Sequence, residues 1–230
     1  MRKTLRFALP AVAALAAVVL TATSAQAATW SSSDKFGSWS NGGYTINNDV
    51  WGGGAGPQSI WANSYSNWGV SSNQPNTGGV KSYPHSGRAI NRTLSSLGSV
   101  TSSFNVSVPG AGAYETAYDI WANNNAYEIM LWMNKTGAVG PIGSLQTTVS
   151  VGGHTWDVYK GSNGSNAVFS FLRHGNTSAG SVDIKAVLNW IRSKGWFGDV
   201  TLGDVQFGFE ITSTGTTRSF TSNSFSVSSS

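Results

Sequence analysis

Apolar and polar residues alternate along most of the chain, which is the pattern of β-strands with one buried face. In one such segment Phe104 and Val106 share one side, and Asn105 and Ser107 share the other. Residues 152–154, Gly-Gly-His, separate two further segments and predict a tight hairpin turn. The predicted strands cover residues 100–108, 114–121, 127–134, 147–151, 155–159, 167–172, 200–212 and 217–227.

One segment follows a different period. Apolar residues in 181–194 recur three or four positions apart, which predicts an amphipathic helix. Ser181 or Asp183 can cap its start, and Gly195 stands where the helix should end. A single helix among many strands predicts an all-β fold, a jelly-roll sandwich of two antiparallel sheets with one packed α-helix.

The N-terminus has the layout of a secretory signal peptide. Basic residues open the chain, an apolar run covers 7–20, and the small-x-small sequence Ala-Gln-Ala stands at 25–27. We therefore predict a signal peptide over 1–27 and one domain over 28–230, secreted and extracellular. A membrane anchor is the alternative, which the short apolar run disfavours.

Composition narrows the choice of ligand. Charged residues make up 10% of the chain and aromatic residues 12%, so Ser, Thr, Asn and Gly supply most of the polarity. Such a surface suits neutral, hydroxyl-rich ligands, which hydrogen-bond and lay CH groups on aromatic rings. Without the basic leader the net charge of +4 falls to about +1, and no Lys/Arg cluster predicts nucleic-acid binding.

The chain contains no cysteine, which excludes thiol catalysis, thiolate metal sites and disulfides. His85, His154 and His174 are scattered, without acids at metal-ligand spacing, and are predicted to be structural or surface residues. We expect no cofactor and no metal.

Each of two glutamates occupies a face of an alternating strand that carries few other charges. Glu128 shares its face with Met130 and Trp132, and Glu210 shares its face with Gln206 and Gly208. A poorly solvated carboxyl group has a raised pKa. Two such groups facing one another can cleave a glycosidic bond, one as nucleophile and one as acid/base. From the pattern alone, both could equally be solvated strand residues.

The predicted strand over 114–121 contains two more acids. Asp119 lies on the same strand face as Trp121 and is placed to hydrogen-bond one of the glutamates. Glu115 has the same parity but lies nearer the start of its strand, so we predict that it is solvated.

At these positions the sequence resembles glycoside hydrolase family 12. Glu128 opens a segment similar to that family's nucleophile strand, and Glu210 closes one similar to its acid/base strand. Asp119 lies in a segment similar to the strand that supports the nucleophile. The matching segments are 47–52, 81–84, 118–121, 128–134, 161–166 and 206–210.

The resemblance implies a jelly roll with a concave substrate cleft, and cleavage of internal β-1,4-glucosidic bonds with retention of configuration. It implies Glu128 as nucleophile, Glu210 as acid/base and Asp119 as support. The partner is then a β-glucan, which can be cellulose, mixed-linkage glucan or xyloglucan, with no nucleic acid or membrane involved. We expect a monomer. The predicted substrate-binding residues are Asn48, Trp51, Trp121, Met130, Trp132, Asn166 and Gln206.

Two other functions fit the same architecture. A non-catalytic carbohydrate-binding or lectin-like sandwich would explain the aromatic residues but not the paired glutamates. A xylanase resembling family 11 would use the same chemistry with different motifs. Trp132 can belong to the cleft or to the core, whereas Trp190 and Trp196 beside the predicted helix are expected to pack.

Overall fold

The computed structural model describes residues 27–230, so the predicted signal peptide lies outside the described residues, apart from Ala27. The described chain forms a six-stranded sheet, β1-β4-β5-β15-β7-β13, and a nine-stranded sheet, β10-β11-β12-β9-β8-β14-β6-β3-β2. The strands are β1 (Trp30–Ser32), β2 (Ser38–Asn41), β3 (Tyr44–Asn47), β4 (Gln58–Ala62), β5 (Trp68–Ser72), β6 (His85–Thr93), β7 (Val100–Ser107), β8 (Ala113–Ala122), β9 (Tyr127–Thr136), β10 (Ser144–Val151), β11 (His154–Ser162), β12 (Ala167–Arg173), β13 (Ala179–Asp183), β14 (Thr201–Ser213) and β15 (Arg218–Ser229).

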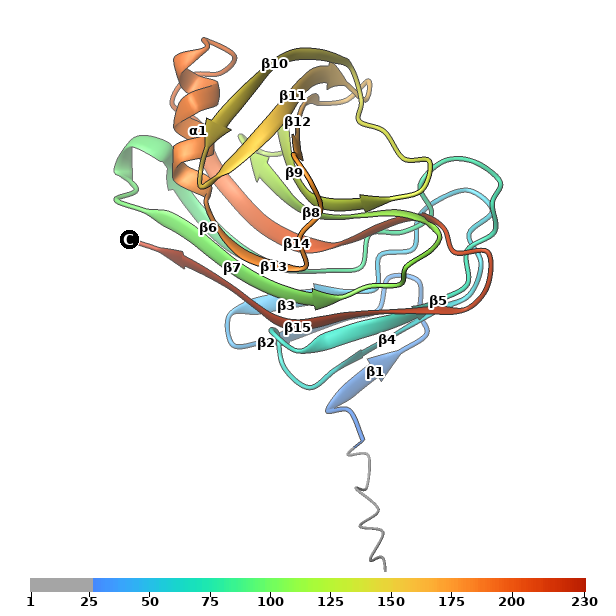
Figure 1. The fold of residues 1–230 in the computed structure, drawn as a ribbon. Helices are drawn as coiled ribbons and strands as arrows, with labels where there is room; N and C mark the ends of the chain where they lie inside the picture. Colours follow the sequence, from blue (N-terminus) through green and yellow to red (C-terminus); the bar gives the residue numbers. More distant parts are fainter. Residues whose placement is uncertain (1–26) are drawn as a thin grey trace, which may run out of the picture.

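The two sheets pack face to face, as predicted, and the larger one curls (Figure 1). Aromatic side chains fill the space between them. Phe207 of β14 lies 4.9 Å from Phe104 and 5.3 Å from Phe225, both in the smaller sheet, measured between ring centroids. Burying one such side chain contributes about 1.5–3 kcal/mol. This layer fixes which face of the large sheet points inward, and the opposite, concave face is left for the pocket described below.

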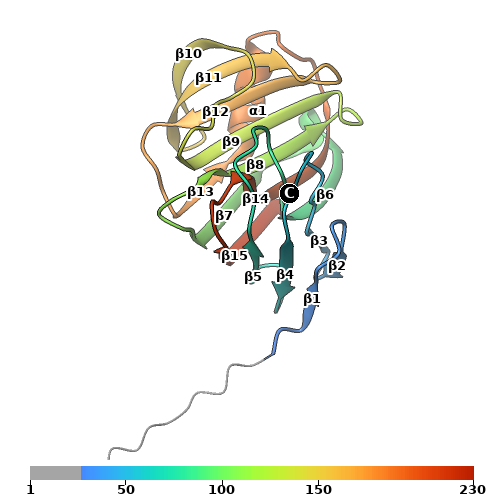
Figure 2. The ribbon, with the colours of Figure 1, turned by 90° about the vertical axis from the view of Figure 1, so that its right-hand side faces the viewer.

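One strand pair departs from the antiparallel prediction. β12 runs parallel to β9, with Ala167 opposite Tyr127. β10, β11 and β12 form an antiparallel meander, so β10 also runs parallel to β9. The segment 137–143 therefore carries the chain across the sheet instead of reversing it beside β9. Figure 2 shows β10, β11, β12 and β9 following one another above β8.

The predicted hairpin is confirmed and is tighter than expected. Gly152 and Gly153 alone connect β10 to β11, with φ of +63° and +93°. Two positive φ values characterise the two-residue turns that match strand twist. A Cβ at Gly152 would lie 2.8 Å from the carbonyl oxygen of Asp183, so only glycine fits there. His154 begins β11 rather than sitting in the turn.

The predicted helix is present as α1 (Ile184–Ser193). Asp183, not Ser181, is its N-cap, and its side chain accepts a hydrogen bond from the backbone N–H of Ala186 at 2.9 Å. Ser181 is the middle residue of β13. Gly195 follows the helix with φ +69°, as a C-terminal glycine should.

The helix covers part of the core face that the smaller sheet does not reach (Figure 1). Trp190 packs edge-on against Phe171 of β12 at 5.6 Å, and Trp196 stacks on Phe169 at 5.6 Å. The packing role predicted for both tryptophans is confirmed. Within 27–230 no helix has the length and apolarity needed to cross a bilayer.

Candidate active site

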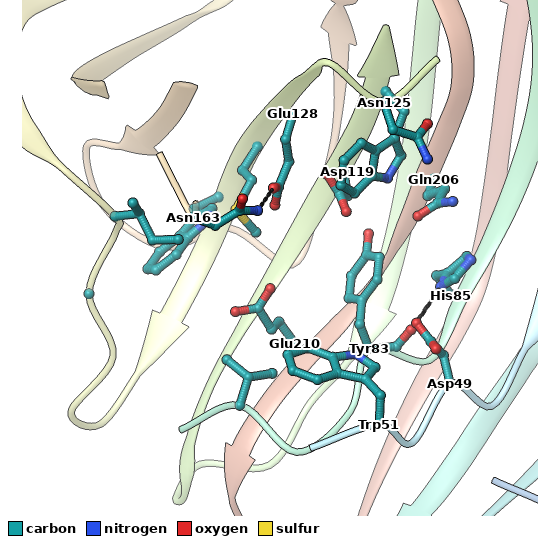
Figure 3. Close-up of a pocket in the computed structure, with 16 residues that line it drawn as sticks. Asp49, Trp51, Tyr83, His85, Asp119, Asn125, Glu128, Asn163, Gln206 and Glu210 are labelled. Carbon is teal, nitrogen blue, oxygen red and sulfur yellow. Dashed lines mark hydrogen bonds and ion pairs between the residues drawn. The ribbon is translucent and has the colours of Figure 1, made fainter. Parts of the chain in front are cut away.

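A pocket of about 550 Å³ opens on the concave face of the nine-stranded sheet (Figure 3). Its floor is an apolar cluster that includes Met130 and Trp132, separate from the main core. Its walls carry carboxyl groups, amides and indole rings. The lining residues are Asp49, Trp51, Val80, Tyr83, His85, Asp119, Trp121, Asn125, Glu128, Met130, Trp132, Gly140, Ile142, Asn163, Gln206 and Glu210.

Strand register and sheet curvature together place Glu128 and Glu210 at this pocket. Glu128 of β9 pairs with Trp121 of β8, and Glu210 of β14 pairs with Glu115 of β8. These two points on β8 are about 20 Å apart along the strand. The curl of the sheet brings the two side chains to one pocket, where Figure 3 shows them on facing sides.

Glu128 is 9% exposed, and Asn163 donates a hydrogen bond from Nδ2 to its Oε2 at 3.1 Å. Burial and the charge of Glu210 raise the pKa of Glu128 to about 7, although the hydrogen bond from Asn163 opposes the shift. Near neutral pH this carboxyl group is therefore divided between its two protonation states.

Asp119 lies between the two glutamates on the central strand, opposite Met130 on one side and Gln206 on the other. Burial and the charges of Glu128 and Glu210 raise the pKa of Asp119 well above its usual range. Its Oδ1 is buried and has no hydrogen-bond partner. A neutral Asp119 can donate a hydrogen bond to a neighbouring carboxylate, the role that the sequence predicted for it toward Glu128.

The prediction that Glu115 is solvated is wrong. Glu115 is 1% exposed, because its position on β8 lies between β9 and β14 in the interior of the sheet. It lies directly beside Glu210 across the β8–β14 strand pair. Burial raises the pKa of Glu210, and the interaction with the Glu115 carboxyl group opposes the shift. Glu210 thus has a carboxyl partner that the sequence did not predict.

Five of the predicted substrate-binding residues line the pocket. Trp51 is 55% exposed on its wall, whereas Trp132 is 3% exposed, so Trp132 belongs both to the buried cluster and to the lining. Gln206 is held by its own hydrogen bond from Nε2 to Asp204 Oδ2 at 3.0 Å. The five residues are Trp51, Trp121, Met130, Trp132 and Gln206.

Two of the predicted substrate-binding residues do not line it. Asn48 is fully buried, where its Nδ2 donates to the carbonyl oxygen of Asp34 and its Oδ1 accepts from Gln58, so it supports the loop rather than contacting a ligand. Asn166 lies at the far end of its loop. Asn163 of the same loop lines the pocket instead, because its Oδ1 accepts from the backbone N–H of Asn166 and its Nδ2 turns toward Glu128.

The pocket also contains residues that the strand patterns could not identify. Tyr83 donates from its hydroxyl to the carbonyl oxygen of Ala117 at 3.1 Å, and His85 packs on its ring. Asn125 comes from the short β8–β9 turn, in which Asn123, Asn124 and Asn125 all have positive φ. Three consecutive asparagines are a usable sign of such a turn, since asparagine tolerates this backbone region. Residues 27–230 hold no cluster of three His or acidic side chains suited to a metal ion.

Comparison with known proteins places these features in context. The family model for glycosyl hydrolase family 12 matches residues 42–229. A probable xyloglucan-specific endo-β-1,4-glucanase A from Aspergillus terreus is 33% identical over 215 residues, covering 85% of this chain and 86% of its own length. Endoglucanase S from Pectobacterium parmentieri is 32% identical and covers 74% of this chain and 76% of its own.

Solved structures give the same picture. The xyloglucanase domain of NopAA, a type three effector from Sinorhizobium fredii solved in complex with cellobiose, superposes with a TM-score of 0.85. It is 45% identical in sequence, and the match covers 88% of this chain and 99% of that domain.

The hydrogen bond from Asn163 predicts a measurable change in the titration of Glu128. Asn163→Ala removes a donor that stabilises the ionised form, so the pKa of Glu128 should rise further above 7. A loss of about 1–2 kcal/mol corresponds to about one pH unit. Carbon-13 NMR of labelled glutamate carboxyl groups measures it. Asn166→Ala is the control, since only the Asn166 backbone takes part; an unchanged or lowered pKa in Asn163→Ala would contradict the prediction.

Proposed function

The chain belongs to glycosyl hydrolase family 12, and on that premise we propose that it cleaves internal β-1,4-glucosidic bonds of glucans with Glu128 and Glu210. The observation that carries the proposal is the meeting of the buried Glu128 and the half-buried Glu210 at one pocket with indole rings around it. A retaining glycosidase needs such a pair, with one carboxyl group on each side of the scissile bond.

The lining of the pocket suits a sugar chain. Trp51 and Trp121 offer apolar ring faces to the CH groups of glucose. Trp132 adds a largely buried indole ring to the apolar floor beneath them. Asn125 and Gln206 supply amides for further hydroxyl groups. Neutral donors and acceptors around an apolar floor match a neutral polysaccharide.

In the proposed first step Glu128 attacks the anomeric carbon while Glu210 protonates the leaving oxygen. Burial raises the pKa of both carboxyl groups, and the charge of Glu210 raises that of Glu128 further, so the two groups can share one proton. A neutral Asp119 donating to Glu128 would place that proton on Glu210, where the step requires it.

In the second step Glu210 takes a proton from the water that attacks the glycosyl-enzyme. Once Glu128 carries the sugar it has lost its negative charge. The loss of a negative neighbour lowers the pKa of Glu210, which favours its ionised form. The same residue can therefore serve as acid and then as base.

The proposal also covers the export of the protein, the place where it acts and its oligomeric state. The predicted signal peptide over 1–27 would direct the chain out of the cell and be removed. The enzyme would then act on extracellular glucan as a monomer. A purely carbohydrate-binding role would leave the paired glutamates without a purpose.

Xyloglucan is the substrate we favour among the glucans. Relatives of this chain bear that name, including the NopAA domain. The β8–β9 turn is short and leaves open space beside the pocket, which a branched glucan chain needs. A second hollow of about 270 Å³ adjoins the pocket there, shares Trp121 and Asn125 with it, and is otherwise lined by small or polar residues such as Asn91 and Asp204. A side-branch sugar would fit such a polar space.

Amide variants test the proposed pair. Glu128→Gln and Glu210→Gln should each lower turnover on xyloglucan by at least about a hundredfold, because an amide can neither attack nor exchange the proton. Gln206→Ala, from the same strand as Glu210, is the matched control and should weaken binding far more than turnover. Retention of more than about a tenth of wild-type turnover by either glutamine variant, with an unchanged fold by circular dichroism, would exclude the pair.

A substrate panel tests the preferred glucan. We expect kcat/KM for xyloglucan to exceed that for carboxymethyl cellulose and lichenan by about tenfold, a difference of about 1.4 kcal/mol that a few hydrogen bonds to side-branch sugars can supply. Xylan should not be cleaved. Reducing-sugar release measures all four. Faster cleavage of an unbranched glucan would refute the xyloglucan preference while leaving the glutamate pair in place.

A further inference from the structure

Glu115 is a buried acid that takes no part in the two steps of the proposed reaction. It lies on β8 directly opposite Glu210 on β14, and opposite Lys135 on β9. It is 1% exposed and is not part of the pocket lining. Glu115 therefore lies beside Glu210 and outside the pocket lining, where it can act on that side chain without touching a substrate.

The surroundings of Glu115 favour its neutral form. Its Oε2 is buried without a hydrogen-bond partner, and the carboxyl group of Glu210 is its principal charged neighbour. Lys135 is attractive but lies at the exposed end of β9. Two ionised carboxyl groups facing each other in the sheet would repel, and burial makes the second charge costly.

The other titratable groups around Glu210 do not change this balance. Glu128 and Asp119 also line the pocket, and both are carboxyl groups. Each is therefore either neutral or negative, and neither can stabilise a negative charge on Glu115. Tyr83 stays neutral, because burial and the surrounding acids raise its pKa well above the usual value. Burial and the nearby Glu210 likewise raise the pKa of Glu115 well above its ordinary value.

We propose that Glu115 is a positioning residue whose neutral carboxyl group donates a hydrogen bond to Glu210 and holds that side chain toward the pocket. The inference rests on the proposed function, since it assigns a task within the same reaction. The proton stays on Glu115 throughout the cycle, and Glu210 alone exchanges a proton with the substrate and with water.

The hydrogen bond matters most in the second step. A donor facing a carboxylate stabilises the ionised form, which is the form that activates water. Without the donor, Glu210 would stay protonated to higher pH and would be a poor base near neutrality. Glu115 thereby lets one residue alternate between acid and base within a narrow pH range.

Two substitutions at position 115 separate the hydrogen bond from mere packing. Glu115→Gln keeps the length and retains an N–H donor. Glu115→Met keeps the length and removes the donor. The substrate is 2,4-dinitrophenyl β-cellobioside, whose leaving group needs no protonation, so turnover reports the step in which Glu210 is the base. Turnover of the wild type on xyloglucan or another β-1,4-glucan establishes the proposed function first, and its absence on all of them would refute that function before any variant is compared.

In Glu115→Met the basic limb of the kcat/KM profile on xyloglucan should move up by about one pH unit, since losing a hydrogen bond to a charged group is worth about that much. Its kcat on the aryl cellobioside should fall about tenfold near pH 6 and recover as the pH rises. Glu115→Gln should keep the wild-type limb.

Three results would overturn the inference. An unmoved limb in Glu115→Met would show that no donor had been lost, whether or not turnover fell. A limb displaced to lower pH in Glu115→Gln would show that Glu115 is ionised in the wild type. An equal fall in kcat at every pH would indicate packing alone. If Glu115→Met does not fold, the Glu115→Gln profile decides by itself.

Discussion

The curl of the nine-stranded sheet around the β9-β8-β14 ladder is the constraint on which the rest of the structure depends. On the inner face, Tyr118, Phe207 and their neighbours pack against the smaller sheet and fix which way each strand faces. A slip of one residue would exchange the two faces and bury the acids in the core. The same register therefore creates the hydrophobic core and places Glu128 and Glu210 at one pocket.

That arrangement concentrates four acids, Glu115, Asp119, Glu128 and Glu210, on three adjacent strands. Burial raises each pKa above its value in the unfolded chain, so the folded state retains protons that the unfolded state releases. The favourable contribution to stability is complete below the unfolded pKa values, about 4, and is lost as pH rises through the folded ones. Proton sharing among the four acids limits this loss of stability. The same shared proton supplies the acid and the base of the proposed reaction.

Period and register explain what the sequence could and could not predict. Alternation located the strands of the ladder and the faces of both glutamates, because a two-residue period is a local property. It could not show that Glu115 lies opposite Glu210, since that depends on the register between strands distant in sequence. The parallel pairing of β12 with β9 was hidden for the same reason. The sequence also could not show that Asn163 rather than Asn166 lines the pocket, since a side chain turning back on its own loop leaves no periodic pattern.

Azide distinguishes the two glutamates by the products it gives with an activated aryl β-cellobioside. In Glu210→Ala the glycosyl-enzyme still forms on Glu128, and azide replaces the base-activated water, so a β-glycosyl azide should accumulate. In Glu128→Ala azide attacks the vacated face directly and should give the α-azide. Proton NMR of the anomeric hydrogen identifies each product. Exchange of the two products would reverse the assigned roles, and the absence of any azide adduct from either variant would contradict the pairing of these residues around one scissile bond.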